Sequence, residues 1–204
     1  PTNPAPVFIL GPGDELVINV WRHVELNRNV PIDPAGKIHM PLAGDIQAAG
    51  LTLAELREAL TTSLSKYFVD PQVDINVASV KSQKIHVLGE VKTPGTYTLD
   101  GPLSALEAVA KAGGFTLDAN PEAVLLIQKS NDVLRASALS LDLRGTLEKS
   151  IEIRALRNGD ILYAAPSRIA NVERFMVRLN SIINPIVNVE RGIVLAPAVI
   201  DALQ

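Results

Sequence analysis

Residues 11 to 21 read GPGDELVINVW, a turn followed by an alternating run. Gly tolerates positive φ and Pro fixes the corner of a turn, so the first four residues favour a reversal of the chain. Leu16, Ile18 and Val20 then share one face of the run. This period of two predicts a β-strand with one buried face.

A second turn lies at residues 33 to 36, which read DPAG. Asp33 first, Pro second and Gly36 fourth match a type I turn. Apolar-rich segments at 30–32 and 37–40 flank it. We therefore predict a hairpin that pairs these two segments.

A helix is predicted after Thr52, because Thr52 and Glu55 have the spacing of a capping box. Leucines three or four residues apart continue its apolar face to about residue 67, and the Asp70-Pro71 pair ends it. Residues 72 to 80 alternate again and predict a strand.

From residue 83 a second unit shows a similar plan. A strand at 85–91 contains Gly89, which indicates a bulge or a close backbone approach. Ser104 and Glu107 repeat the capping-box spacing, and Gly113-Gly114 ends the helix. Strands are expected at 124–128, loosely at 133–143, and at 161–164 after a turn at 158–160.

The two units share a short sequence motif, Gly13-Asp14 and Gly159-Asp160, each followed by an apolar strand. In such turns a carboxylate can bond the backbone two residues further on. The pattern predicts an α+β fold of two small units, not one doubly wound sheet.

The order of five motifs over residues 8 to 80 resembles the signature of the outer-membrane polysaccharide export (Wza-like) family. They read LGPGDEL at 10–16, VPIDPAG at 30–36, MPLAG at 40–44, AGLTLAEL at 49–56 and YFVDPQV at 67–73. The second unit is similar to a soluble-ligand-binding β-grasp module. Its motifs read VLGEV at 87–91, PGTY at 94–97, AVAKAGG at 108–114 and GDILY at 159–163.

The resemblance implies a set of residues whose role is mainly structural. They are Gly11, Pro12, Gly13, Asp14, Asp33, Gly36, Pro41, Gly44, Gly50, Thr52, Asp70, Pro71, Gly89, Pro94, Gly95, Gly113, Gly114, Gly159 and Asp160. It also implies four segments: an extended leader at 1–7, an export domain at 8–82, a β-grasp domain at 83–166, and a C-terminal amphipathic helix and tail at 167–204.

In function, the resemblance implies a non-enzymatic subunit of a closed ring that exports capsular or exopolysaccharide through the periplasm and outer membrane. Its expected partners are further copies of itself, an inner-membrane copolymerase and the polymer. A signal peptide or lipidated Cys is expected upstream of residue 1. Long members of the family carry two or more ligand-binding modules, whereas one is recognisable here, which implies a shorter stack or a partner that completes it. The alternative is a periplasmic glycan-binding adaptor without its own pore.

An apolar stripe at helical spacing runs through residues 168 to 187. Its members are Ile169, Val172, Phe175, Met176, Leu179, Ile182, Ile183 and Ile186. About 20 helical residues would span a bilayer, so the stripe can face lipid around a pore. It can equally pack on its own β-grasp unit or a neighbouring protomer, and Pro185 weakens a continuous span.

Composition argues against several classes of site. The chain has no Cys and a formal net charge of -3, which disfavour thiol chemistry and nucleic-acid binding. Aromatic residues make up 4%, too few for a dedicated lectin. His23, His39 and His86 are isolated from other ligand types, and no phosphate-loop or nucleophile-elbow motif occurs. We expect no metal, no cofactor and no catalytic residue.

Overall fold

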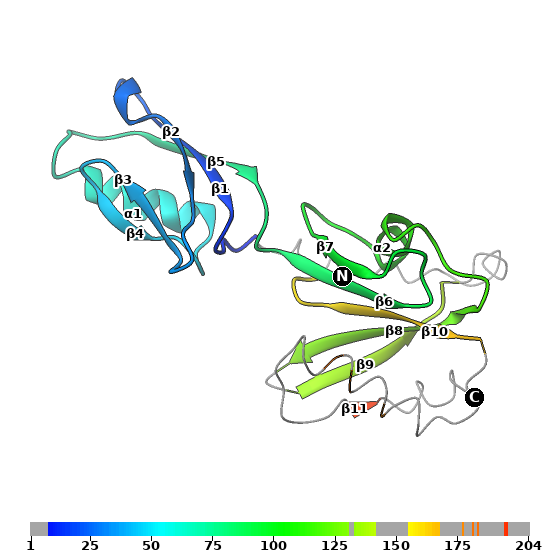
Figure 1. Cartoon of the computed structure of the whole chain (residues 1–204). Coiled ribbons are helices and arrows are strands. Elements are labelled where there is room, and N and C mark those ends of the chain that lie inside the picture. The colour runs from blue at the N-terminus through cyan, green and yellow to red at the C-terminus, as the bar shows by residue number, and fades with distance from the viewer. Residues whose placement is uncertain are drawn as a thin grey trace, which may run out of the picture. The chain divides into compact units, whose positions relative to one another are not determined.

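The computed structural model describes residues 8–130, 133–141 and 155–167, with Val177, Ser181, Ile183 and Val194–Leu195. The chain divides into two compact units, residues 1–83 with 98–100 and residues 84–97 with 101–204. Each unit combines a helix with β-sheet (Figure 1), so the predicted α+β class is confirmed.

The first unit builds two small sheets and one long helix. Its described elements are β1 (Glu15–Val20), η1 (Val24–Leu26), β2 (Arg28–Pro31), β3 (Lys37–Met40), β4 (Gly44–Gln47), α1 (Leu53–Leu64) and β5 (Val73–Ser79). The strands form an antiparallel sheet in the order β2-β1-β5 and a separate β3-β4 hairpin. The strands predicted over residues 15–21 and 72–80 are thus confirmed, as β1 and β5.

The core of the first unit lies on one face of this three-stranded sheet. Leu16, Ile18 and Val20 are buried there with the α1 leucines, as the alternation of β1 predicts. The capping box of α1 is also present: Glu55 N donates to Thr52 Oγ1 (3.2 Å), and Thr52 N donates to Glu55 Oε2 (2.7 Å). The opposite face of the sheet carries the partly exposed or exposed side chains of β1 and β5.

Two predictions for the first unit need correction. The turn at Asp33 forms, with Gly36 N bonded to Asp33 O (2.9 Å), but its flanking strands do not pair as a hairpin. β2 pairs with β1, and β3 pairs with β4, which begins after the three residues 41–43. Helix α1 ends at Leu64, with Ser65 as its C-cap, and not near residue 67 as predicted.

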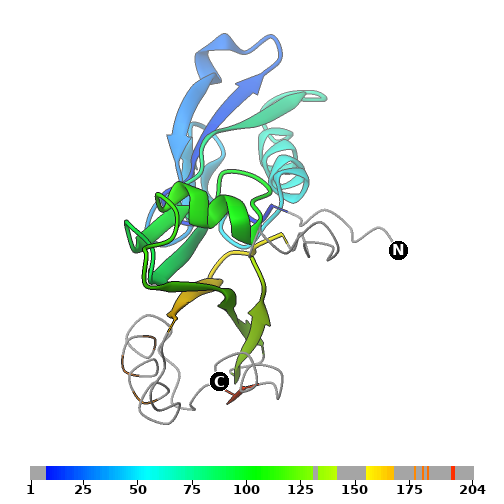
Figure 2. The ribbon, with the colours of Figure 1, turned by 90° about the vertical axis from the view of Figure 1, so that its right-hand side faces the viewer.

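The second unit contains one mixed sheet. Its described elements are β6 (Lys84–Gly89), β7 (Gly95–Thr98), α2 (Ala105–Lys111), β8 (Ala119–Ser130), β9 (Val133–Leu139), β10 (Ile161–Pro166) and β11 (Val194–Leu195). The strand order is β11-β9-β8-β10-β6-β7, with β10 parallel to β6 and antiparallel to β8. Figure 2 shows α2 and the sheet from a second side.

The predicted strands and helix of the second unit all form, but β9 ends at Leu139 and not at residue 143, and the bounds of β6, β8 and β10 also differ from those predicted. Strand β8 extends well beyond the apolar run at 124–128, because it pairs with both β9 and β10. Helix α2 begins in the predicted capping box at Ser104. It ends in a Schellman arrangement, in which Gly114 N donates to Val109 O (2.9 Å) and Gly113 N to Ala110 O (3.0 Å).

Candidate functional site

Asp14 is the most highly connected of the predicted signature residues. Its side chain is fully buried and accepts four hydrogen bonds. Gly11 N (3.0 Å) and Ser82 Oγ (2.7 Å) donate to Oδ2, and Lys81 N and Ser82 N donate to Oδ1 (2.8 Å each). Asp14 therefore ties the start of β1 to the segment that follows β5.

A tight turn sets the position of the Asp14 carboxylate. Asp14 N donates to Gly11 O (3.2 Å), Pro12 occupies the second position and Gly13 has φ +90° at the third, as in a type II turn. The carboxylate consequently points back to the amide three residues earlier. The prediction that it bonds the backbone two residues further on is wrong, because this turn directs it the other way.

Asp160 occupies a turn of the same form in the second unit. Gly159 has φ +81°, and Asp160 N donates to Arg157 O (3.1 Å). The side chain is 4% exposed and accepts from Arg157 N (2.8 Å), again three residues earlier, so the same correction applies. The Gln128 side chain also donates to it, at 2.9 and 3.1 Å. The Gly-Asp motif that occurs in both units thus forms the same type of turn in each.

Gly89 lies where two strands approach each other closely. Its φ is +82°, and a Cβ on this residue would lie 2.2 Å from the carbonyl oxygen of Ala164 in β10. No L-residue with a side chain fits there without a shift of the backbone. The close approach predicted for Gly89 is therefore confirmed.

The three histidines lie apart and have different partners. His23 contacts the Phe68 ring (centroids 3.9 Å apart), and His39 Nδ1 lies 2.8 Å from Asp45 Oδ1. His86 Nδ1 lies 3.0 Å from Thr96 Oγ1, and burial, helped by the Lys84 charge, lowers the pKa of His86. Among the described residues, no three His, Asp or Glu side chains come close enough together to hold a metal ion.

The predicted C-terminal stripe falls almost wholly outside the described residues. Its one described member, Ile183, is fully buried in a cluster with Leu125, Ile127 and Ile161 of the second unit's sheet. In the described part of the chain, no helix is long and apolar enough to cross a membrane. The other stripe residues remain a prediction.

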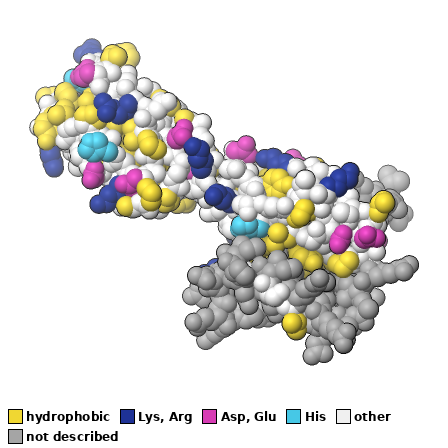
Figure 3. All heavy atoms as spheres, viewed as in Figure 1, with side chains coloured by type: hydrophobic (Ala, Val, Ile, Leu, Met, Phe, Trp, Pro, Cys, Tyr) yellow, Lys and Arg dark blue, Asp and Glu magenta, His cyan; other side chains and the backbone are white. Residues whose placement is uncertain are grey.

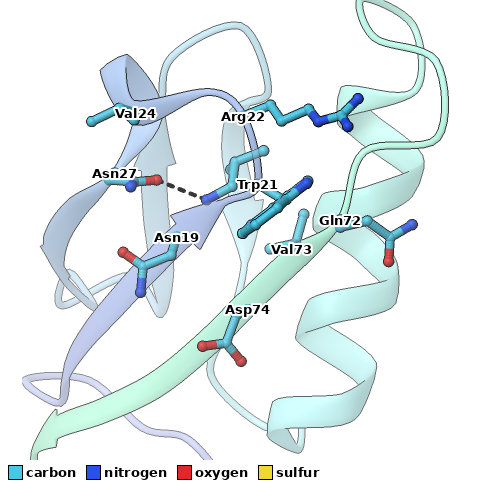
Figure 4. A pocket seen from close by; sticks show the side chains of 9 residues that line it. Asn19, Trp21, Arg22, Val24, Asn27, Gln72, Val73 and Asp74 are labelled. Atoms are coloured by element: carbon cyan, nitrogen blue, oxygen red, sulfur yellow. Dashed lines mark hydrogen bonds between the residues drawn. The ribbon is translucent and has the colours of Figure 1, made fainter.

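An open pocket of about 910 Å³ lies at one end of the first unit (Figure 4). It is formed where β1 runs into η1 and where β5 begins. Its lining residues are Asn19, Val20, Trp21, Arg22, Val24, Asn27, Gln72, Val73 and Asp74. The sequence analysis assigned no site here. The available signal was the position of the single Trp on the outward face of an alternating strand.

Comparison with known proteins identifies both units. Residues 2–78 match the family model described as "Polysaccharide biosynthesis/export protein", and residues 83–164 match the SLBB domain. The chain is 32% identical over 183 residues to the EPS I polysaccharide export outer membrane protein EpsA of Ralstonia solanacearum. That alignment covers 78% of this chain and 48% of EpsA.

Two less similar relatives also have names that refer to polysaccharide transport or production. The polysialic acid transport protein KpsD of Escherichia coli is 27% identical over 163 residues, covering 79% of this chain and 28% of KpsD. The exopolysaccharide production protein ExoF of Rhizobium meliloti (strain 1021) is 28% identical over 118 residues, covering 52% and 28%. The chain spans about half the length of EpsA and less of the other two. It belongs to the polysaccharide biosynthesis/export protein family and carries an SLBB domain after its export domain.

Proposed function

We propose that this chain is a subunit of a ring-shaped periplasmic and outer-membrane channel that exports capsular or exopolysaccharide. The observation that carries the proposal is the order of the two matched domains, together with the similarity to EpsA across both. The export family is not an enzyme family, and we propose that the chain acts by geometry, as a conduit for a hydrated polymer.

The proposed domain boundaries follow the two matched ranges. We propose an export domain at 8–82 and an SLBB β-grasp domain at 83–166, preceded by a leader at 1–7 and followed by a C-terminal helix and tail at 167–204. The matched ranges, 2–78 and 83–164, support the central boundary. A closed ring needs two different complementary faces on each protomer, and an inner-membrane copolymerase would supply the polymer to it.

The export function is tested by deleting the gene in its native host and measuring surface and released polysaccharide. We expect the deletion to abolish export and the intact gene to restore it, with polymer synthesis measured separately by the intracellular pool. Normal export in the deletion strain would overturn the proposal.

A second function is favoured by one observation, the burial of Ile183 against the sheet of its own unit. If the stripe at 168–187 packs there, the chain can serve as a periplasmic glycan-binding adaptor without a pore. The two functions differ in assembly, since the adaptor needs no closed ring. Detergent extraction from membranes followed by mass measurement separates them: a discrete oligomer supports the channel, and a monomer supports the adaptor.

A further inference from the structure

The pocket at the end of the first unit is centred on an exposed aromatic ring. Trp21 is the only Trp of the chain, and 70% of its surface is exposed to solvent. Exposing so large an apolar side chain is costly, and a Trp that served only the core would be covered. Leu16, Ile18 and Val20 of the same run already fill the core on the opposite face. Trp21 is thus available to a ligand.

Polar side chains line the pocket around this ring. Asn19 lies opposite Asp74 across the β1–β5 ladder, and the backbone N of Trp21 donates to Gln72 O (2.9 Å). In Figure 4 the Trp21 ring is drawn between Arg22 and Gln72 on one side and Asn19 and Asn27 on the other. The backbone pairing holds these residues in place, so the arrangement exists before any ligand binds.

These polar groups retain hydrogen-bonding capacity. Asn19 and Arg22 have no side-chain bond to another residue that the structure describes. Asn27 uses its Oδ1 to accept from Val20 N (2.8 Å), which leaves its amide donors available. Gln72 donates to Asp70 Oδ1 (3.1 Å), which leaves its carbonyl oxygen available. The lining of the pocket therefore offers donors and acceptors in addition to the aromatic face of Trp21.

This combination matches the chemistry of a pyranose ring. One face of a pyranose is formed by C–H groups, which pack on an aromatic ring, and its edge carries hydroxyls that both donate and accept. An anion alone would gain little from the indole face. We propose that the Trp21 pocket is a weak saccharide-binding subsite that contacts the exported polymer.

The proposal rests on the proposed export function only in naming the exported polymer as the ligand. Weak binding suits a conduit, because a tight site would retain the chain. For one aromatic contact with a few hydrogen bonds we expect a Kd on the order of 1 mM. This value agrees with the scarcity of aromatic residues, which disfavours a tight lectin site.

The direct test uses Trp21 as its own reporter. The full chain is titrated with three hexasaccharides, cellohexaose, chitohexaose and hexagalacturonate, and the Trp21 emission is followed with the side-chain amide NMR signals of Asn19, Asn27 and Gln72. We expect a saturable shift of these signals with at least one sugar. No saturable shift with any of the three would overturn the proposal. So would a shift that follows protein concentration instead of sugar, because it would make the pocket a protein contact.

Variants test whether the sugar binding depends on the Trp21 ring itself. Trp21→Ala should weaken the binding seen by the NMR signals about five- to tenfold, the effect of losing one aromatic contact. Trp21→Phe should keep most of the binding. Tyr67→Ala is the matched control, since Tyr67 is 57% exposed but does not line the pocket. Equal binding by Trp21→Ala and the wild type would contradict the subsite.

In the deletion strain the same variants distinguish the two proposals. If the wild-type gene fails to affect export, the proposed function fails whatever the sugar titration shows. If the wild-type gene restores export and Trp21→Ala, present at equal level, restores it fully, the pocket does not contact the polymer in transit. We expect Trp21→Ala to export several-fold more slowly than wild type and Tyr67→Ala.

Discussion

The two aspartates that are buried in the described part of the chain, Asp14 and Asp160, lie in turns of the same type. Asp14 receives two amides and a hydroxyl from residues 81–82, more than 65 positions away in the sequence. Asp160 receives the Gln128 side chain from within its own sheet. On the surface that Figure 3 shows, charged and apolar side chains lie interspersed over the described parts of both units. In the first unit this turn therefore connects the two ends of the domain, residues 11–14 and 81–82. In the second unit the same turn bonds to a strand of the neighbouring sheet, through Gln128 of β8.

The largest difference should come from Asp14→Ala. This change leaves four donors without their buried acceptor, and we expect the first unit to lose about 3–5 kcal/mol of unfolding free energy. Urea unfolding followed by Trp21 fluorescence reports on that unit. Asp45→Ala, at an exposed carboxylate of the same unit, should stay within about 0.5 kcal/mol of wild type. A loss below about 1 kcal/mol for Asp14→Ala would contradict its closing role.

Gly89→Ala tests the second unit at its tightest point. The new Cβ would meet the Ala164 carbonyl at 2.2 Å in a left-handed conformation, so we expect a loss of about 2–4 kcal/mol. Gly114→Ala has a similar φ, +87°, but open space, and should lose only about 1–2 kcal/mol. Far-UV circular dichroism during urea unfolding measures both. Equal losses would show that the close approach carries no cost of its own.

Asp160→Asn should have a smaller effect than Asp14→Ala. The substitution places an amide opposite the Gln128 amide but retains one acceptor, so we expect a loss of about 1–3 kcal/mol, confined to the second unit. Replacing Gln128 by Glu in the Asp160→Asn background restores a donor and acceptor pair and should recover part of the loss. If the Trp21 transition moves instead, the two turns are not independent.

The smallest effect should be a pH dependence that only the second unit shows. The pKa of His86 is lowered in the folded state, so the unfolded chain binds the proton at a higher pH. The contribution of His86 to stability is complete above its ordinary pKa of about 6.5 and falls as the pH drops through that value. We expect wild type to lose more stability than His86→Gln between about pH 7.5 and 5.5. Identical profiles would show that His86 is not involved.

Local patterns in the sequence predicted the local structure well. The alternation that buries Leu16 and Ile18 on one face of β1 depends on residues close in sequence, and so do the capping boxes at Thr52 and Ser104. All three features are present. The pairing of β3 with β4 was not predicted, because the turn at residues 33–36 does not decide which strand pairs with β3.

The candidate sites were harder to predict for the same reason. Asp14 stood out in the sequence, but its donors at 81–82 come from the far end of the unit. The Trp21 pocket joins residues 19–27 to residues 72–74, and only the antiparallel pairing of β1 with β5 brings these segments together. No spacing within either segment indicates such a site.

The central claim, that copies of this chain form a closed export channel, is tested most directly by electron microscopy of the full-length protein extracted from its native membrane in detergent. We predict closed rings of uniform subunit number with a central passage. Dispersed monomers at the same protein concentration would contradict the channel and favour the adaptor.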